Sequence, residues 1–362
     1  MLVHICCSVD SHFFLQKLQQ SYPQEELIGF FYDPNIHPFS EYELRLLDVK
    51  RSCAKLGIPL HVGAYNYEGW LEAVRGLEGE PEKGKRCQVC FDNRLEASAQ
   101  KALEIGEKTI TTTLLTSPKK SLDQLEKALR TIADKYHLEI AVPDFRKGGG
   151  TQEQFVLAKE AMLYHQDYCG CIFALSVQRA HQQRWADELS SPLRPQILPS
   201  SIEERIALYE RVIALEASET PFKLVREKFL NYRLLCAWVK NSDKEIVPSY
   251  MLFYSTCKKE RVKATIEFMS EGVGFFGKEE ARFIPLSMFN ALANTEYKNV
   301  KEMLQNPPTI EKEITFRNSV MNSLCASLTP LIVLDEVKMG AYELFIQSKT
   351  YHDIRENLVL IS

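Results

Sequence analysis

The chain has 362 residues, of which 45% are hydrophobic and 25% charged, and its formal net charge is −4. This composition is typical of an ordinary folded protein and excludes a disordered or fibrous one. The length favours two domains over one. The slightly acidic balance excludes a global attraction to nucleic acid, so any such contact must come from a local basic patch. The apolar runs are too short for a membrane helix and no basic leader segment is present, so we expect a cytoplasmic protein without a membrane partner.

Short apolar runs alternate with helical patterns in the first half of the chain. Strands are predicted over 2–5, 27–32, 59–62, 109–115 and 138–142. Helices are predicted over 11–20, 41–56, 90–103, 122–136 and 152–166. This alternation predicts a Rossmann-like, HUP-like α/β fold, in which a doubly wound and mostly parallel sheet is covered by helices.

The pattern changes near residue 190, where Ser, Pro and Leu occur without periodicity. We interpret 191–201 as a linker between a domain over 1–190 and a smaller α+β domain over 202–362. In the second domain, apolar spacing predicts helices over 202–213 and 222–239 and strands near 247–254, 262–268, 331–334 and 342–346.

Six of the ten cysteines occur as three close pairs. The pairs are Cys6 with Cys7, Cys87 with Cys90, and Cys169 with Cys171. In a reducing compartment, such pairs indicate metal or redox chemistry more than structural disulfides. Adjacent cysteines cannot form a disulfide with each other without strain. The first pair and Asp10 directly follow the first predicted strand, where open α/β sheets place their ligands.

The number of paired thiols favours iron and sulfur over zinc. A structural zinc site takes four ligands and would leave two of the six thiols without a role, whereas iron–sulfur chemistry suits a larger set of thiolates. The remaining cysteines stand alone among apolar or helical neighbours, and we expect them to be small core residues. These four are Cys53, Cys236, Cys257 and Cys325.

The motifs of the first half resemble, in order, those of the QueH family of epoxyqueuosine reductases. They are His4-Ile5-Cys6-Cys7 with Asp10, Phe31 to Pro38 with Glu41, Tyr42 and Arg45, Arg86 to Cys90 with Arg94 and Leu95, Thr112 to Pro118, Asp144 to Lys147, and Tyr164 to Cys171. The resemblance covers residues 4 to about 175 and does not extend over 200–362. It departs at Ser8-Val9, at Asp33 where Asn is usual, and at Ala174 where Ser is expected; none of these changes removes a thiol or the carboxylate.

The resemblance implies an oxidoreductase of queuosine biosynthesis and tRNA processing. The family reduces the epoxide of epoxyqueuosine at the wobble position of the tRNA anticodon to give queuosine, without cobalamin. The cofactors it implies are a [4Fe-4S] cluster held by three cysteines and an adjacent mononuclear iron held by two cysteines and Asp10. The implied partners are the tRNA substrate and an external electron donor.

The chemistry of this reaction agrees with the residues. Removal of an epoxide oxygen needs two electrons and a group that accepts the departing oxygen; a cluster carries electrons one at a time, and an iron with an open position is a Lewis acid. The expected metal ligands are the six paired cysteines and Asp10, and the expected catalytic residues are Asp10 and Tyr168. Side chains that suit phosphate, hydroxyl or base contacts give the expected substrate-binding set: Tyr32, Asn35, His37, Arg86, Arg94, Arg146 and Lys147.

Two other interpretations of the chain remain open at the sequence level. One is an ATP-dependent tRNA-modifying enzyme of the same architecture, although Cys6-Cys7 stands where such enzymes carry a glycine-rich loop. The other is a non-catalytic zinc-binding or RNA-binding module.

The second domain contains two groups of basic residues that suit tRNA binding. Lys223, Arg226, Lys228 and Arg233 lie in the predicted helix over 222–239, and Lys258, Lys259, Arg261 and Lys263 form a short run. The alternative is a solvated face on a domain that serves oligomerisation.

Overall fold

The computed structural model describes all residues except 119, 190–195, 278–280, 322–326 and 362. These residues form two compact units. The first unit comprises Met1–Gln182, Arg205–Val225 and Asn357–Ser362, and the second comprises Gln183–Glu204 and Arg226–Glu356. Among the residues described, no helix has the length and apolar character needed to cross a membrane.

A five-stranded parallel sheet forms the centre of the first unit. Its strands are β1 (Leu2–Ile5), β2 (Ile28–Phe31), β3 (Leu60–Val62), β4 (Thr109–Thr112) and β5 (Glu139–Ile140). They are ordered β3-β2-β1-β4-β5 and every adjacent pair is parallel. All four residues of β1 are buried, as expected for the central strand of a sheet covered on both faces. The predicted doubly wound α/β fold is therefore confirmed.

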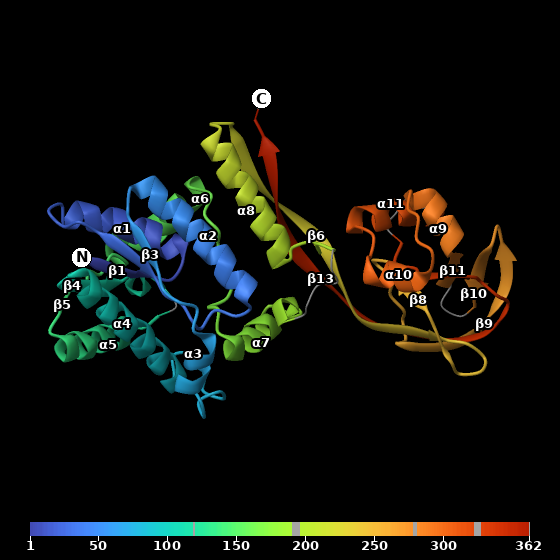
Figure 1. Ribbon diagram of the computed structural model, residues 1–362, viewed down its shortest axis with the longest axis horizontal. Coiled ribbons are helices and arrows are strands. Elements are labelled where there is room, and N and C mark those ends of the chain that lie inside the picture. The colour runs from blue at the N-terminus through green and yellow to red at the C-terminus, as the bar shows by residue number, and fades with distance from the viewer. Residues whose placement is uncertain (119, 190–195, 278–280, 322–326, 362) are drawn as a thin grey trace. The chain divides into compact units, whose positions relative to one another are not determined.

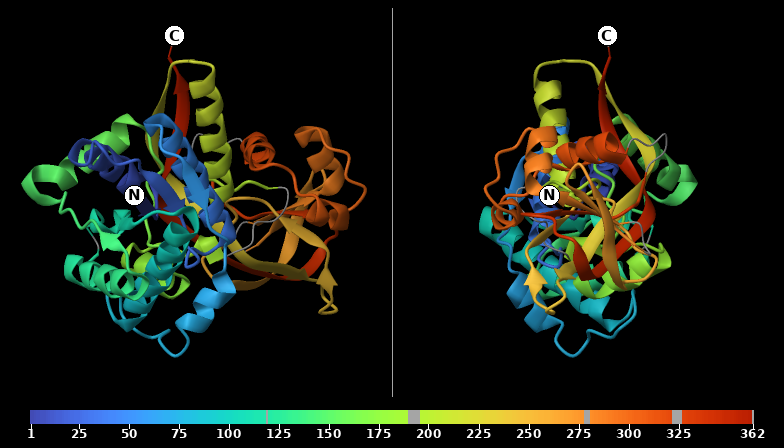
Figure 2. Two further views of the ribbon diagram at one scale, coloured as in Figure 1. Left: turned by 60° about the vertical axis from the view of Figure 1, so that its left-hand side comes forward. Right: turned by 90° about the vertical axis from the view of Figure 1, so that its right-hand side faces the viewer.

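Helices cover the sheet on two sides, with α1 and α2 together on one side and α4 and α5 together on the other (Figure 1, Figure 2). The helices are α1 (Ser8–Ser21), α2 (Phe39–Leu56), α3 (Tyr67–Ala73), α4 (Lys85–Ile105), α5 (Leu122–Tyr136), α6 (Gly150–Glu160), α7 (Ile172–His181) and α8 (Ile202–Ala217), with 3-10 turns η1 (Thr113–Leu115), η2 (Lys147–Gly149) and η3 (Asp187–Leu189). Helix α2 ends as predicted at Gly57, whose φ of 66° is left-handed.

The strand order reverses at β1, which pairs with β2 on one side and with β4 on the other. In an open parallel sheet, the crevice at such a reversal, beyond the carboxyl ends of the strands, is where ligands bind. Cys6 and Cys7 directly follow β1, and Cys7 is the residue before α1. The fold therefore places the first cysteine pair at this crevice.

The second unit contains a mixed eight-stranded sheet with the order β7-β6-β13-β9-β10-β11-β12-β8. Its strands are β6 (Phe222–Lys240), β7 (Ile246–Val247), β8 (Ser249–Met251), β9 (Arg261–Ser270), β10 (Val273–Phe276), β11 (Ala281–Pro285), β12 (Leu331–Leu334) and β13 (Gly340–Leu360), and its helices are α9 (Leu286–Ala293), α10 (Val300–Gln305) and α11 (Ile310–Met321). Strands β11 and β12 are parallel. Strands and helices together confirm the predicted α+β class.

Two apolar clusters lie on opposite faces of this sheet. One face gathers side chains of β6 and of β8 to β13, including Val239, Val262 and Leu344. The other face, at β8, β10, β11 and β12, packs against helices α9 to α11 through residues such as Ile284 and Phe289. The core of the second unit is therefore built from both faces of the sheet.

The expected helix over 222–239 is wrong, because this segment is strand β6. Its run of aromatic and branched residues suits a strand, and the adjacent β13 and β7 in the sheet pair its backbone groups. Consequently Lys223, Arg226 and Arg233 do not share a helical face. Arg226 pairs with Glu356 at 3.0 Å, and the buried Arg233 pairs with Asp187 at 2.6 Å.

The structure also divides the chain differently from the expected domains, 1–190 and 202–362. Most of α8 belongs to the first unit, where Glu216 accepts hydrogen bonds from Arg51 and Lys55, all at 2.8 Å. The expected linker, 191–201, lies partly outside the described residues. Helix α8 therefore belongs with the sheet of the first unit, beyond the predicted boundary.

The four isolated cysteines do not all lie in a core as expected. Cys53 is buried, but Cys236 on β6 is exposed and Cys257 is half-buried. Cys325 lies outside the described residues. The expectation was wrong for Cys236 because it assumed a helix, whereas alternate residues of a strand point to opposite faces.

Candidate metal centre

Cys6, Cys7 and Asp10 form a buried group whose ligand atoms all lie within 4.8 Å of one another. The Sγ of Cys6 is 3.7 Å from the Sγ of Cys7 and 3.7 Å from Oδ2 of Asp10. The group surrounds the N-terminus of α1, where the helix dipole favours negative charge on thiolates and carboxylates. Two thiols and a carboxylate in this position are a candidate ligand set for one metal ion.

The two distances from the Cys6 sulfur to the other ligands fit a tetrahedral metal site. With metal–sulfur bonds of about 2.3 Å and metal–oxygen bonds of about 2.1 Å, the edges of a tetrahedral site are about 3.8 Å between two sulfurs and about 3.6 Å between sulfur and oxygen. The corresponding separations here are both 3.7 Å. A tetrahedral metal held by two thiolates and one carboxylate would have a fourth position free for another ligand.

Two neighbouring side chains orient the group. Gln154 on α6 donates from Nε2 to Oδ1 of Asp10 at 2.7 Å, and Thr113 lies with its Oγ1 3.3 Å from the backbone nitrogen and 3.5 Å from the Sγ of Cys6. Burial raises the pKa of Asp10, although hydrogen bonds from the two cysteines and Gln154 oppose that shift. Gln154 thus leaves Oδ2 of Asp10 directed towards the sulfur.

The other four paired cysteines lie at the starts of two helices. Cys87 and Cys90 are three residues apart in the first part of α4, so their side chains lie on one face of that helix. Cys169 and Cys171 precede α7 on either side of Gly170, whose φ is 94°. A Cβ at Gly170 would lie 2.9 Å from the side chain of Ile36, so the glycine allows this close approach. None of these four cysteines forms a disulfide bond with a described residue.

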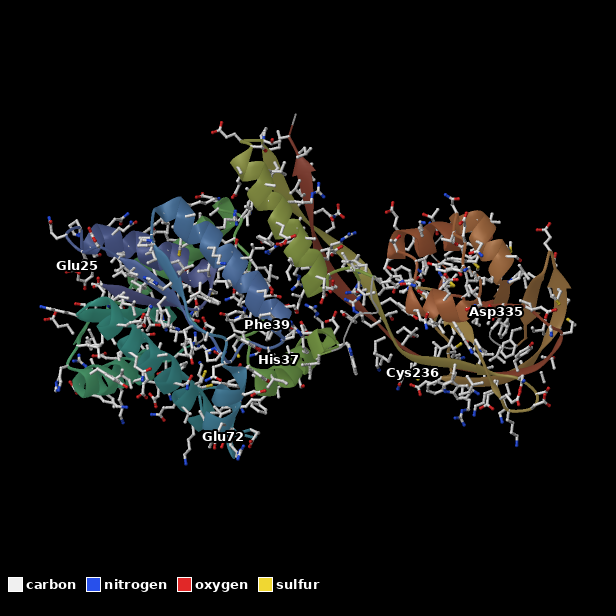
Figure 3. All side chains as sticks on the ribbon, in the orientation of Figure 1. Glu25, His37, Phe39, Glu72, Cys236 and Asp335 are labelled. Carbon is white, nitrogen blue, oxygen red and sulfur yellow. The ribbon has the colours of Figure 1, made fainter. Side chains whose placement is uncertain are left out.

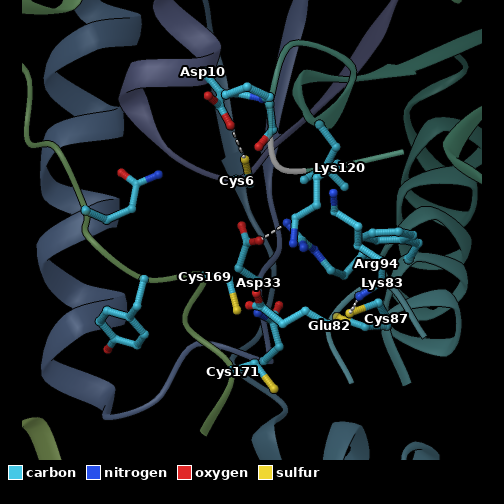
Figure 4. Close-up of a pocket in the computed structure, with 18 of the residues that line it drawn as sticks. Cys6, Asp10, Asp33, Glu82, Lys83, Cys87, Arg94, Lys120, Cys169 and Cys171 are labelled. Atoms are coloured by element: carbon cyan, nitrogen blue, oxygen red, sulfur yellow. Dashed lines mark hydrogen bonds and ion pairs between the residues drawn. The ribbon is translucent and has the colours of Figure 1, made fainter. Parts of the chain in front are cut away.

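One cavity of about 150 Å³ brings most of these residues together (Figure 4). Its lining includes five of the six paired cysteines together with Asp10: Cys6, Cys87, Cys90, Cys169 and Cys171. Cys7 is not part of the lining but contacts Cys6. Segments separated by up to about 165 residues in the sequence therefore meet at a single site.

Positive side chains beside the thiols favour thiolates, which are the form that binds metals. Although burial opposes its charge, the half-buried Lys120 has a raised pKa because Cys169, Cys87 and Cys90 lie nearby. A hydrogen bond from Cys171 lowers the pKa of Cys169 to about 5, against the opposite effect of burial. Burial raises the pKa of Cys90.

Besides Asp10, four of the residues predicted for catalysis or substrate binding line the same cavity, namely Asn35, Arg86, Arg94 and Tyr168. Asn35 Oδ1, Arg86 Nε and Arg94 Nε are buried and have no hydrogen-bond partner among the described residues. Arg94 also forms a buried ion pair with Asp33, and burial raises the pKa of that carboxyl to about 7. The cavity thus offers buried polar atoms to a polar ligand.

Tyr32 and His37 lie outside the lining that the structure describes. The ring of Tyr32 stacks on Phe30 with 5.8 Å between centroids. The ring of His37 stacks on Tyr67 at 5.1 Å, and its backbone carbonyl accepts a hydrogen bond of 2.7 Å from the hydroxyl of Tyr168. In this structure His37 contributes through its backbone, by holding Tyr168.

Arg146 and Lys147 are also absent from the lining. Arg146 donates to the backbone carbonyls of Leu115, Lys120 and Leu114 at 2.6, 2.9 and 3.2 Å. It therefore holds the loop that carries Lys120. Lys147 is exposed and pairs with Asp144 at 3.3 Å.

Several lining residues were not predicted from the sequence. They are Val9, Asp33, Arg45, Trp70, Glu82, Lys83, Phe91, Leu114, Ser117, Pro118, Lys120, Ser121, Gln124, Phe155, His165 and Gln166. Asp33, Arg45, Ser117, Pro118, His165 and Gln166 lie within the quoted motifs, and that position was the available signal. Lys120 and Gln124 come from helix or loop segments without such a signal, and only the fold brings them to the thiols.

Comparison with known proteins relates the chain to one family. The model of the family described as epoxyqueuosine reductase QueH matches residues 1–177. The epoxyqueuosine reductase QueH of Helicobacter pylori is 42% identical over 352 residues, which cover 93% of this chain and 94% of that protein. The corresponding protein of Thermotoga maritima is 37% identical over 182 residues, covering 49% of this chain and 92% of its own.

Among solved structures, the U34-tRNA thiolase NcsA of Methanococcus maripaludis with its [4Fe-4S] cluster is 15% identical, with a TM-score of 0.29 over 59% of this chain and 72% of that chain. This likeness is too low to carry an argument. The relationship rests on the sequence matches, of which the Helicobacter protein covers both units. The chain therefore belongs to the epoxyqueuosine reductase QueH family.

Proposed function

We propose that the chain reduces the epoxide of epoxyqueuosine in a tRNA anticodon, using a [4Fe-4S] cluster and a second, mononuclear iron held in the cysteine cavity. The observation that carries this proposal is the Cys6, Cys7 and Asp10 group, in which the two distances from the Cys6 sulfur match edges of a tetrahedral site. The four other paired cysteines, Cys87, Cys90, Cys169 and Cys171, line the same cavity. Membership of the family supports the reaction, and the types of ligand atoms in the cavity support the proposed metals.

The proposed ligand assignment follows the geometry. Cys6, Cys7 and Asp10 would hold the mononuclear iron, and three of the other four paired cysteines would hold the cluster. When bound, these groups supply single electrons from the cluster and a Lewis-acid position at the iron. The fit is chemical as well as geometric, because soft thiolates suit an iron–sulfur cluster and a mixed set with a carboxylate suits a single iron.

The protein itself would bind and orient the substrate. Arg86 and Arg94 provide buried guanidinium groups, and Asn35 provides an amide oxygen without a partner among the described residues. The substrate would complete these hydrogen bonds, since buried polar atoms are costly when unpaired. Removal of the epoxide oxygen as water consumes two electrons and two protons, so an external electron donor is required.

Asp10 and Tyr168 are the proposed catalytic residues. Asp10 acts as a metal ligand, with Gln154 holding its second oxygen. Tyr168 lines the cavity, and its hydroxyl is held by the carbonyl of His37. To deliver its proton to the departing oxygen, this hydroxyl would turn from the His37 carbonyl to the substrate.

An anaerobic assay tests the proposal. The full-length protein is reconstituted with iron and sulfide, given dithionite as electron donor, and incubated with tRNA that contains epoxyqueuosine. The nucleosides are then identified by mass spectrometry after digestion. We expect conversion to queuosine by the wild type and by Cys53→Ser, because Cys53 is buried but lies outside the cavity. Iron-loaded protein that leaves the epoxide intact would contradict the proposal.

A further inference from the structure

One face of strands β6, β13 and β9 combines two stacked aromatic rings with basic side chains. We call it the Trp238 face and define it by six residues: Trp238, Lys240, Arg261, Lys263, Glu343 and Phe345. The rings of Trp238 and Phe345 stack with 5.3 Å between centroids and 10° between planes. Lys240 and Arg261 lie 4.9 and 5.4 Å from the centre of the Trp238 ring.

Strand alternation places this face opposite the apolar core of the second unit. Val239, Val262 and Leu344 belong to that core, and their neighbours along each strand therefore point to the other side of the sheet. Cys236, which precedes Trp238 by two residues and is labelled on β6 in Figure 3, is exposed. The Trp238 face is consequently the outer surface of these three strands.

This surface differs from that of the neighbouring strands in how it is covered. On β11 and β12 the corresponding surface is apolar and α9 packs on it, while α10 packs on β8. On the Trp238 face, Trp238 and Phe345 are only half-buried, and the side chains of Arg261 and Lys263 are 63% and 72% exposed. The two rings are therefore partly accessible to a ligand, beside two exposed cations.

The charges of the face select an anionic ligand. Lys240, Arg261 and Lys263 are positive and Glu343 is the single carboxylate among the six defining residues, so these six carry a net charge of about +2 at neutral pH. Glu343 lies 3.2 Å from Arg261 and 3.6 Å from Lys263. It holds both cations beside the aromatic pair and partly neutralises them.

From these observations we infer that the Trp238 face binds RNA, with an unpaired base stacking on Trp238 and phosphates pairing with Arg261, Lys263 and Lys240. A sheet surface with exposed aromatic rings and flanking cations is a physical solution for binding unstacked bases. The inference rests on the proposed function in one respect, because the RNA is taken to be the tRNA substrate. It assigns the second unit a role in holding the substrate.

The test measures the affinity of the full-length protein for fluorescently labelled tRNA by anisotropy, at several salt concentrations. Trp238→Ala should weaken binding about tenfold or more, because stacking on an aromatic side chain contributes strongly for each base. Trp238→Phe should restore most of the loss. Thermal unfolding of each variant checks that the second unit remains folded.

Charge variants provide a second readout that does not depend on Trp238. The double variant Arg261→Gln with Lys263→Gln should lower the slope of log affinity against log salt by about two, because two phosphate contacts are lost. Glu343→Gln should strengthen binding several-fold, because it frees both cations. Lys301→Ala, an exposed lysine on α10, is the matched control and should leave affinity and slope unchanged.

Each result separates this inference from the proposed function. Variants of the face should retain wild-type iron and sulfide contents. If the wild type reduces its tRNA while the Trp238 and double variants bind with unchanged affinity and salt slope, this inference is wrong and the proposed function stands. Weaker binding by Glu343→Gln, or an equal loss in Lys301→Ala, would also overturn it. If the protein binds tRNA through this face but leaves the epoxide intact, the proposed function fails alone.

Discussion

The cysteine cavity of the first unit and the Trp238 face of the second unit use polar side chains in opposite ways. In the cavity, the thiols, a carboxylate and two arginines are buried or half-buried, and Gln154 fixes the carboxylate. On the face, the side chains of Arg261 and Lys263 are largely exposed. Metal ligation depends on exact bond geometry, whereas phosphate binding depends mainly on charge and tolerates movement. Substitutions should therefore have near-complete effects in the cavity and graded effects on the face.

The largest expected effect is the replacement of a paired cysteine by serine. Cys6→Ser and Cys7→Ser should reduce turnover by about a thousandfold or more, because a hydroxyl is a poor ligand for a metal that prefers sulfur. Of the variants at Cys87, Cys90, Cys169 and Cys171, three should lose the cluster and one should keep it. Iron and sulfide analysis of the six variants measures this, and Cys53→Ser is the control.

Two outcomes of this cysteine series would contradict the proposed metal ligands. Full turnover and iron content in Cys6→Ser or Cys7→Ser would remove that residue from the ligand set. Loss of the cluster in all four of the other variants would contradict a cluster held by three cysteines.

A smaller effect is expected at Gln154, which contacts a proposed ligand but no metal. Gln154→Leu removes the hydrogen bond to Oδ1 of Asp10 while keeping a side chain of similar size. Hydrogen-bond partners of metal ligands typically contribute about 10-fold to 100-fold to metal affinity. The iron affinity of the variant, measured by competition with a chelator, should therefore fall by about that factor. Gln100→Leu, an exposed position on α4, should behave as the wild type. Unchanged iron retention in Gln154→Leu would show that Asp10 needs no such support.

The smallest expected effect concerns Glu216, which ties α8 to α2. The hydrogen bonds of Glu216 to Arg51 and Lys55 hold its pKa below the usual value, although burial opposes the shift. Because the folded-state pKa is lowered, its contribution is present above the unfolded-state value of about 4.3 and is lost as the pH falls through the folded-state value. Glu216→Gln should lower stability by about 1 kcal/mol at pH 7.

Denaturant unfolding at pH 7 and near pH 3 measures this difference. The wild type and Glu216→Gln should differ at pH 7 and converge at the lower pH. Equal stability at both pH values would show that α8 contributes nothing to the first unit through this contact.

Much of the first unit was predictable because its parallel strands lie in short segments rich in apolar and β-branched residues, and several of its helices have clear apolar periodicity. The five predicted strands and the helix over 122–136 all appear in the structure. Segment 222–239 was mispredicted because a long run of alternating bulky apolar and charged residues fits either period. The pairing of β6 with distant β13, which decides the matter, is not encoded locally.

The thiols of the site were predictable because close cysteine pairs are rare and chemically specific. Lys120 was not, because a lysine before a helix is ordinary in sequence and becomes significant only where the fold places it beside Cys87, Cys90 and Cys169. Arg146 illustrates the reverse case. Its motif suggested a substrate contact, but its guanidinium is occupied by three backbone carbonyls.

The most direct test of the account is the ratio of iron to acid-labile sulfide in reconstituted wild type and in Asp10→Ala. We expect about five irons to four sulfides in the wild type, from one cluster and one mononuclear iron. In Asp10→Ala the ratio should fall to about four to four, with the brown colour retained and turnover lost, because the carboxylate is proposed to bind the single iron alone. The same ratio in both proteins, or zinc in place of iron, would contradict the account.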